Sequence, residues 1–247
     1  MEESFNDLIF GVHPLIEALE SGQNIDKILL NKESRGDSFT KIKQLAKSRF
    51  IPVSMVPLQK LQRVTRSNHQ GVVAFISPIA FQSIETVLPA LFDKGKDPLL
   101  LILDGITDVR NFGSILRTSE CMGVDAVMLP AKNSVAVNAD TVKTSAGAIY
   151  NIPICKEWHF GTSMQYLKNA GVRLIGCTEK TDKLASAGDY TGPIAIVMGA
   201  EDIGIHPLTI DKLDEIVKIP MAGKTASLNV AVATGMILYE VQRQKNK

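Results

Sequence analysis

The 247-residue chain carries 27 lysine and arginine side chains against 26 aspartate and glutamate side chains, so its net charge of +1 indicates no particular class of partner. Hydrophobic residues make up 45% and charged residues 21% of the chain, as is typical of a globular protein. No apolar run reaches the ~18 residues of a membrane-spanning helix, and the acidic start lacks a signal-peptide core, which predicts a cytoplasmic protein with no membrane partner. The three cysteines form no Cys-x2-Cys pair, which predicts reduced thiols and no metal site.

Residues 1–77 have the pattern of a small α/β domain. Pro14 opens an amphipathic helix that ends near Leu19, and a second helix is expected over residues 39–49. Aliphatic and β-branched runs predict strands over residues 27–31, 52–56 and 72–77.

Between Ser38 and Arg66 the chain has seven basic residues and no acidic one. One interpretation is a solvated helix face followed by a loop. The other is a patch that follows phosphate charge, because an excess of Lys and Arg on one small domain is typical of nucleic-acid binding. The second interpretation predicts RNA contacts from Lys41, Lys43, Lys47, Arg63 and Arg66.

Residues 78–97 end in the polar, turn-rich sequence Asp93-Lys-Gly-Lys-Asp-Pro98, which suits a linker. Beyond it, the continuous apolar run at residues 99–103 is typical of a buried parallel strand. Further strands are expected over residues 126–129, 173–177, 194–198 and 215–219, and helices over residues 112–122, 139–148, 161–170 and 228–244. This alternation predicts an α/β domain over residues 98–247, with a parallel sheet covered by helices on both faces.

Ligands of parallel sheets bind beyond the carboxyl ends of the strands, so the loops that follow strands are the candidates for chemistry. The first such loop, residues 103–117, brings Asn111 to the beginning of a helix and places Arg117 inside it. On spacing alone, Asn111 could be an N-cap and Arg117 a surface residue.

The second loop, residues 198–205, has glycines that permit close approach of a ligand to the backbone, with Glu201 between them. It is not a Gly-x-Gly-x2-Gly motif, so a dinucleotide site is poorly supported. The third loop, residues 219–233, contains Gly223-Lys-Thr, but Lys218 stands where a phosphate loop requires a glycine, which excludes a nucleoside triphosphatase. Ser227 and Asn229 are either cap residues or polar groups turned into a pocket.

Taken in chain order, these loops resemble the three motifs of the SpoU (TrmH-like) branch of the SPOUT methyltransferases. The resemblance spans residues 98–244 and rests on Asn111-x5-Arg117, Gly199-x-Glu201-x2-Gly204, and Ile219-Pro-Met followed by Ser227-Leu-Asn-Val. Residues 1–77 resemble the substrate-binding domain that many members place first. Residues 200–203 depart from the family pattern, in which a serine often precedes the glutamate and a Gly-Lys-like pair follows it; we interpret this as variation in the cofactor wall.

The resemblance implies a parallel α/β sheet whose C-terminal part is threaded into a trefoil knot, one of the rare exceptions to unknotted chains. It implies that the knot's loops hold S-adenosylmethionine, that the protein is a homodimer, and that it methylates a ribose 2′-hydroxyl of RNA. Within the family, the sequence most resembles enzymes that act on a guanosine of large-subunit ribosomal RNA.

By the same resemblance, Arg117 acts at the reacting ribose. A guanidinium normally keeps its proton, with a pKa above ~12, so Arg117 is a base only in a dry pocket beside phosphate. Otherwise it grips a phosphate while water or phosphate accepts the proton, and the sequence leaves both roles open. The other implied catalytic residues are Asn111, Glu201, Ser227 and Asn229. The implied cofactor-binding residues are Thr178, Met198, Gly199, Ala200, Ile219, Met221 and Leu228.

Two rival functions remain. A relative that acts on transfer RNA would share the catalytic core, although the separate N-terminal domain favours ribosomal RNA. The second rival is an RNA-binding protein without catalytic activity. The presence of all five implied catalytic residues argues against this second function.

The helix expected over residues 228–244 is apolar around much of its circumference, through Leu228, Val232, Met236, Ile237 and Tyr239. Such a stripe is wider than packing on one sheet face requires. It predicts a twofold dimer through this helix and the one over residues 112–122, the alternative being burial inside one subunit.

Overall fold

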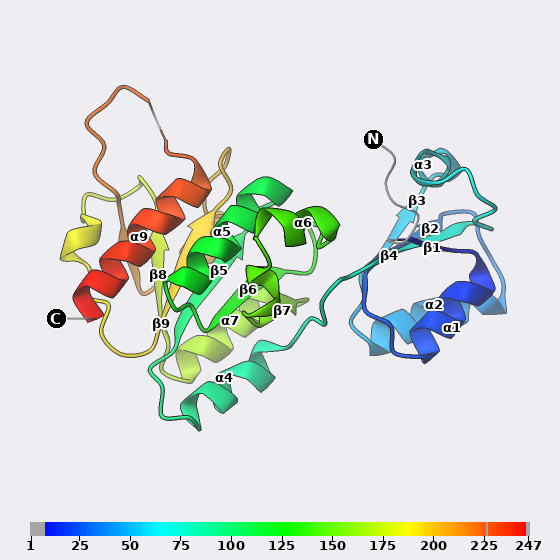
Figure 1. The fold of residues 1–247 in the computed structure, drawn as a ribbon, viewed down its shortest axis with the longest axis horizontal. Helices are drawn as coiled ribbons and strands as arrows, with labels where there is room; N and C mark the ends of the chain where they lie inside the picture. The colour runs from blue at the N-terminus through cyan, green and yellow to red at the C-terminus, as the bar shows by residue number, and fades with distance from the viewer. Residues whose placement is uncertain (1–7, 226, 246–247) are drawn as a thin grey trace. The chain divides into compact units, whose positions relative to one another are not determined.

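The computed structural model shown in Figure 1 describes residues 8–225 and 227–245. The chain forms two compact units: unit 1 consists of residues 8–80 and 137–139, and unit 2 of residues 81–136 and the described residues from 140 onward. The acidic start, residues 1–7, lies outside the described residues.

Unit 1 is a four-stranded mixed sheet with helices on both faces. Its elements are β1 (Leu8–Phe10), α1 (Val12–Glu20), β2 (Ile25–Asn31), α2 (Asp37–Ser48), β3 (Val53–Val56), α3 (Leu58–Val64) and β4 (Val72–Ile76). The strand order is β1-β4-β2-β3, with β4 antiparallel to both neighbours and β2 parallel to β3. The two helices and three strands expected from the sequence are present, and β1 and α3 are additional.

The side chains of each strand in unit 1 alternate between two apolar cores. Ile28 and Leu30 belong to the core that α1 and α2 cover, whereas Leu29 packs in a second core with Leu61 of α3. Figure 1 accordingly shows α1 and α2 together on one side of the sheet and α3 on the other.

This arrangement separates the basic residues that the sequence suggested as one patch. Helix α2 carries Lys41, Lys43 and Lys47, whereas Arg63 lies on α3 and Arg66 just after it. In addition, the Lys41 ammonium lies 2.6 Å from the Glu20 carboxylate of α1. The five residues therefore do not share one face of the sheet, because nearness in sequence does not determine which face a helix covers; their contact with RNA stays a prediction.

Unit 2 contains a six-stranded sheet in which every pair of neighbouring strands is parallel. The strands are β5 (Leu99–Asp104), β6 (Ala126–Pro130), β7 (Ile154–Glu157), β8 (Arg173–Cys177), β9 (Ile194–Gly199) and β10 (Glu215–Val217). Their spatial order is β10-β8-β9-β5-β6-β7. The expected α/β fold with a parallel sheet is confirmed; the trefoil knot stays a prediction.

Helices cover both faces of this sheet (Figure 1). They are α4 (Ile84–Phe92), α5 (Val109–Cys121), α6 (Ala139–Thr144), α7 (Phe160–Asn169), α8 (Pro207–Ile210) and α9 (Val230–Lys245), with short 3-10 turns at Ala148–Tyr150 and Ala185–Ala187. Helices α4 and α7 share a core with Leu100 and Val197 of the central strands. Helix α5 packs against α9, and the Gln242 amide of α9 donates to the Met122 carbonyl after α5 at 2.6 Å.

The segment 78–97, which the sequence suggested as a linker, contains α4. Ser83 caps this helix by accepting a hydrogen bond from the Glu85 backbone N–H at 3.2 Å. Ile84 and Leu88 are almost fully buried in the core of unit 2. Residues 84–92 are therefore a helix of unit 2 and not part of a linker. The polar turn at residues 93–98 follows this helix directly, and its composition alone suggested that the whole segment is a linker.

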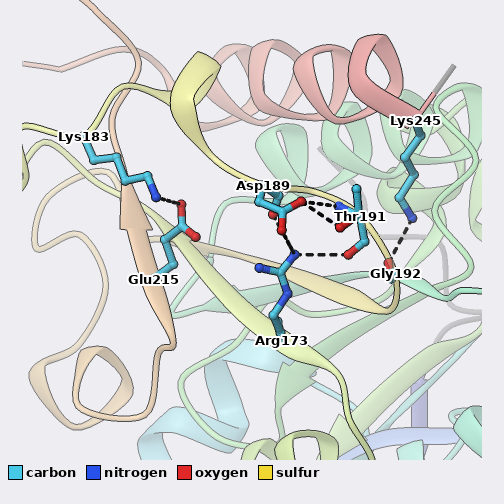
Figure 2. A network of polar contacts seen from close by, with 7 residues as sticks. All are labelled: Arg173, Lys183, Asp189, Thr191, Gly192, Glu215 and Lys245. Carbon is cyan, nitrogen blue, oxygen red and sulfur yellow. Dashed lines mark hydrogen bonds and ion pairs between the residues drawn. The ribbon is translucent and has the colours of Figure 1, made fainter. Parts of the chain in front are cut away.

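Polar contacts hold the segment between β8 and β9 in place (Figure 2). The Arg173 guanidinium donates to the carbonyls of Asp189 and Thr191, at 2.8 and 3.1 Å, and lies 3.4 Å from the Asp189 carboxylate. Hydrogen bonds from Thr191 lower the pKa of that carboxyl group, so it remains ionised beside the arginine. Lys183 pairs with Glu215 of β10 at 2.8 Å. The segment is thus tied to both β8 and β10.

Candidate active site

The carboxyl ends of β8, β9 and β10 lie at one edge of the sheet of unit 2, because β8 pairs with both of the other strands. A cavity of about 480 Å³ opens there. Its walls come from residues 177–180 after β8, residues 198–204 at the end of β9, and the segment between β10 and α9. This volume falls in the range of roughly 300 to 1,000 Å³ that is usual for small-molecule sites.

The structure brings together all seven residues that were expected to bind a cofactor. The cavity is lined by Thr178, Met198, Gly199, Ala200, Ile219, Met221 and Leu228. Two of the expected catalytic residues, Glu201 and Ser227, line it as well.

Sequence reasoning missed five polar lining residues, which are Cys177, Glu179, Lys180, Asp202 and Lys218. Cys177 ends β8, Glu179 and Lys180 follow shortly after it, and Lys218 directly follows β10. The rule that ligands bind beyond the carboxyl ends of parallel strands could have found the residues at β8, had it been applied to that strand as well as to β5, β9 and β10. Lys218 was missed because the last strand was expected to extend to residue 219, whereas β10 ends at Val217.

The wall after β8 is held against the segment after β10. The Lys218 N–H donates to the Lys183 carbonyl, and the Lys218 carbonyl accepts from the Ala185 N–H, each at 2.8 Å. The Lys218 ammonium also pairs with Asp182 at 2.8 Å and lowers the pKa of that carboxyl group. These contacts fix the backbone from which Ile219 lines the cavity.

A tight turn closes the cavity at the end of β9. The Ala200 and Gly204 backbones exchange hydrogen bonds of 3.1 and 2.9 Å. A Cβ atom on Gly199 would lie 2.1 Å from the Ile205 nitrogen, and Gly204 has a φ of +69°, which disfavours other residues. Position 199 therefore requires glycine because the backbone of Gly204 and Ile205 passes close to it. The sequence pattern had suggested a different reason, the close approach of a ligand.

Three residues from distant parts of the chain form a polar cluster beside this turn. The Asn229 amide donates to Glu201 Oε1 at 2.6 Å and to Asn111 Oδ1 at 3.0 Å. Glu201 Oε1 also accepts the Val230 backbone N–H at 3.2 Å. The cluster thereby connects the beginnings of α5 and α9 to the turn after β9.

The helix caps settle which of the two asparagines is a cap. Asn229 Oδ1 accepts the backbone N–H groups of Ala231 and Val232, at 3.0 and 3.2 Å, at the beginning of α9. Helix α5 is capped by Asp108, which accepts the Asn111 N–H at 2.8 Å. Asn229 therefore acts both as a cap and as part of the cluster, whereas the Asn111 side chain is not the cap.

The structure does not bring Arg117 to the cavity of its own chain. Arg117 lies on α5 with its side chain exposed, and it is absent from the cavity lining. It also has no hydrogen bond or ion pair with any of the described residues. The guanidinium is therefore available to a ligand outside the folded chain.

The Cys177 thiol faces a different constraint. Burial, with a smaller contribution from the nearby Glu179 carboxylate, raises its pKa to about 12. The thiol therefore stays protonated near neutral pH, and a protonated thiol is a poor nucleophile and a poor metal ligand.

In the described part of the chain, no group of three or more His, Cys, Asp and Glu side chains is placed to hold a metal ion. No helix among residues 8–225 and 227–245 has the length and apolar character needed to cross a membrane.

Comparisons with known proteins cover nearly the whole chain. The profile of the SpoU rRNA methylase family matches residues 98–239. A profile described as RNA 2′-O ribose methyltransferase substrate binding matches residues 8–82. The chain is 31% identical to YacO of Bacillus subtilis, which is named as a member of the TrmH family of tRNA/rRNA methyltransferases, over 98% of this chain and 97% of that protein. A Staphylococcus saprophyticus protein named in the same way is 36% identical, over 97% of this chain and 96% of that one.

Solved structures show the same fold. The SpoU methyltransferase AviRb from Streptomyces viridochromogenes, determined in complex with AdoMet, superposes with a TM-score of 0.62 at 24% identity, covering 97% of this chain and 90% of that one. A TrmH/SpoU tRNA modifying enzyme of A. aeolicus gives a TM-score of 0.56 at 29% identity, over 61% of this chain and 77% of that one. The profile match over residues 98–239 and the relatives at 31% and 36% identity establish that the chain belongs to the SpoU family of RNA methyltransferases.

Proposed function

We propose that this protein transfers the methyl group of S-adenosylmethionine to a ribose 2′-hydroxyl of RNA. The observation that carries the proposal is the cavity at the carboxyl ends of β8, β9 and β10, bordered by the Glu201–Asn229–Asn111 cluster. Family membership supports methyl transfer to RNA. The substrate-binding profile over residues 8–82 and the AdoMet complex of AviRb support the ribose target and the methyl donor.

The cavity residues fit this donor chemically. Met221 and Leu228 expose 43% and 36% of their surface beside the cavity, so apolar groups are available to cover an adenine ring. The carboxylates of Glu179 and Asp202 suit the cationic sulfonium and amino groups, and Lys218 suits a carboxylate. When bound, S-adenosylmethionine supplies the electrophilic methyl group.

The polar cluster and Arg117 have separate roles in the proposal. Glu201, Asn229 and Asn111 hold the turn after β9 to the beginnings of α5 and α9, which fixes the cavity wall. Ser227, which lines the cavity, faces the ribose. Arg117 grips the RNA phosphate beside the reacting ribose through its paired N–H groups, and water or phosphate accepts the hydroxyl proton. The alternative, in which Arg117 is itself the base, requires a dry pocket.

We also propose that the protein is a homodimer with a shared active site. Val232, Met236 and Tyr239 recur along one face of α9 and are 53%, 45% and 61% exposed, whereas Ile237 is fully buried. A second copy covers this apolar face. Arg117 lies on the exposed side of α5, and α5 packs against α9. In this proposal, the dimer interface on α9 therefore brings Arg117 close to the cavity of the partner subunit.

The RNA that is methylated in this proposal is large-subunit ribosomal RNA, at a guanosine, in the cytoplasm. The substrate-binding match over residues 8–82 supports it, and the A. aeolicus tRNA modifying enzyme aligns with only 61% of this chain. Transfer RNA is the second candidate, because the names of the bacterial relatives include both RNAs. Mapping 2′-O-methyl groups on both RNAs from a deletion strain distinguishes them: the missing modification identifies the substrate.

Two experiments test the enzyme itself. Calorimetry with S-adenosylmethionine in the presence of a chelator should give saturable binding, and absence of heat and of any thermal shift would refute the cofactor. Mixing inactive Arg117→Ala subunits with inactive Asn229→Ala subunits should restore methyl transfer in the heterodimer if the site is shared. A monomeric mass in light scattering, or a mixture that stays inactive, would contradict the shared site.

A further inference from the structure

Unit 1 contains a cavity of its own, of about 510 Å³, which we call the α3 pocket. It is formed by α3 and the turn that leads into β4, and its lining includes Leu58, Gln62, Arg66, Asn68, His69 and Gln70. No carboxylate lines it, so its polar groups are amides, hydroxyls, an imidazole and one guanidinium. Such a lining suits a ligand that combines negative charge with hydrogen-bonding edges.

His69 contributes a buried group to the α3 pocket. Its side chain is only 9% exposed, and Nδ1 accepts the Gly71 backbone N–H at 3.1 Å. A nitrogen that accepts a hydrogen bond carries no proton, so the neutral imidazole carries its proton on Nε2. Among the described residues, Nε2 has no hydrogen-bond partner. The largely buried imidazole thus keeps one accessible donor in the lining of the cavity, where a ligand can accept its hydrogen bond.

The turn beside His69 is held in a fixed and strained shape. Gln70 has a φ of +50°, in the left-handed region that side chains other than glycine rarely adopt. Its Oε1 accepts the Val12 backbone N–H at 3.0 Å, one of the N–H groups that the beginning of α1 leaves without a helical partner. Gly11, before this helix, provides no side-chain cap. The contact to α1 offsets the strain, and backbone strain of this kind is frequent at ligand sites.

We propose that the α3 pocket binds one unstacked nucleotide of the RNA substrate. Arg66, which is exposed and has no polar partner among the described residues, contacts the phosphate. Leu58, 41% exposed, packs on the face of the base. The Gln62 and Asn68 amides and His69 Nε2–H read the edge of the base, as proteins do when they recognise single-stranded RNA. This inference rests on the proposed function, because it gives the RNA a specific contact on unit 1.

Gln62→Ala and Arg66→Gln test the pocket in the full-length protein. Both side chains are exposed, so neither change should unfold unit 1. Each variant should bind total ribosomal RNA or total transfer RNA, whichever the wild type binds, about five- to tenfold more weakly in a filter assay. Gln44→Ala is the matched control, since Gln44 is an exposed glutamine on α2, across the sheet from the pocket, and it should bind RNA like the wild type.

The double variant Lys43→Gln with Lys47→Gln tests the competing surface on α2. If it loses more RNA affinity than Arg66→Gln, or if Gln62→Ala and Arg66→Gln bind like the wild type, the pocket proposal is overturned. An equal loss in Gln44→Ala would overturn it as well, because the effect would then not be specific to the pocket.

A second readout does not depend on activity. In the NMR spectrum of the full chain, uridine and guanosine 5′-monophosphates at millimolar concentration should shift the imidazole signals of His69 and leave those of the other three histidines unchanged. The absence of a His69 shift with either nucleotide would contradict the pocket. Failure of the proposed function would look different: S-adenosylmethionine binding or methyl transfer to RNA would be absent in the wild type as well.

Discussion

Asn229→Ala tests how much the polar cluster at the beginning of α9 contributes. The side chain caps α9 through Oδ1, and its amide donates to Glu201 at 2.6 Å and Asn111 at 3.0 Å. Loss of an asparagine cap costs about 1 kcal/mol. The amide contacts add roughly 0.5 kcal/mol, because Asn229 and Glu201 are exposed and water competes for these bonds. We expect the free energy of unfolding to fall by about 1.5 kcal/mol.

Two other variants separate these contributions. Asn229→Ser keeps an oxygen that accepts the backbone N–H groups of α9, so it should lose only about 0.5 kcal/mol while breaking the contact to Glu201. Asn229→Asp also keeps the cap, but it places a second carboxylate where the amide now donates to Glu201 at 2.6 Å. Repulsion between the two ionised groups should make this variant the poorest in cofactor affinity, and its stability should improve relative to Asn229→Ser as the pH falls.

Urea unfolding followed by circular dichroism measures the stabilities, and calorimetry measures affinity for S-adenosylmethionine. If Asn229→Ser is as unstable as Asn229→Ala, the cap is not the source of the loss. If all three variants bind the cofactor and methylate RNA like the wild type, the cluster has no part in the site, and the reasoning from its geometry is refuted.

Arg117→Ala should slow methyl transfer by roughly 10²–10³-fold while cofactor affinity stays within a few-fold, and Arg117→Lys should fail nearly as badly; wild-type rates in a radiolabel assay would contradict this role. Gly199→Ala should abolish cofactor binding in calorimetry, since its Cβ would lie 2.1 Å from backbone, whereas Gly223→Ala, with nothing within 4 Å, should bind normally. At pH 8, iodoacetamide should modify the exposed Cys121 and spare Cys177, whose pKa burial raises to about 12. Because that pKa exceeds the ordinary value of 9.0, the stabilising contribution of the Cys177 thiol is complete below about pH 9 and is lost as the pH rises toward 12, which alkaline unfolding curves of Cys177→Ser would check.

Much of the fold of unit 2 could be predicted because its signals are local. The apolar run at residues 99–103 became β5, in which Leu99 to Leu103 are all buried. The run at residues 173–177 became β8 with the same limits. Strands buried on both faces show such runs whatever their neighbours are, so periodicity is sufficient to find them.

Elements that depend on their neighbours were missed. β7, with the sequence Ile-Cys-Lys-Glu, has two buried and two partly exposed residues because it is the edge strand beside β6. β1 has only three residues and gains its structure from pairing with β4. Neither pattern differs enough from a loop to be recognised without the partner strand.

The α/β class, the three loops after strands and the family resemblance follow from the sequence, because each rests on short stretches of contiguous residues. Folding brings Asn229 into contact with Glu201 and Asn111, which are 28 and 118 residues away. Folding also places α2 and α3 on opposite faces of the sheet of unit 1, and it leaves Arg117 outside the lining of the cavity of its own chain. Local patterns do not predict these contacts because the strand order β10-β8-β9-β5-β6-β7 differs from the order along the chain, so the packing of whole elements determines which residues become neighbours in space.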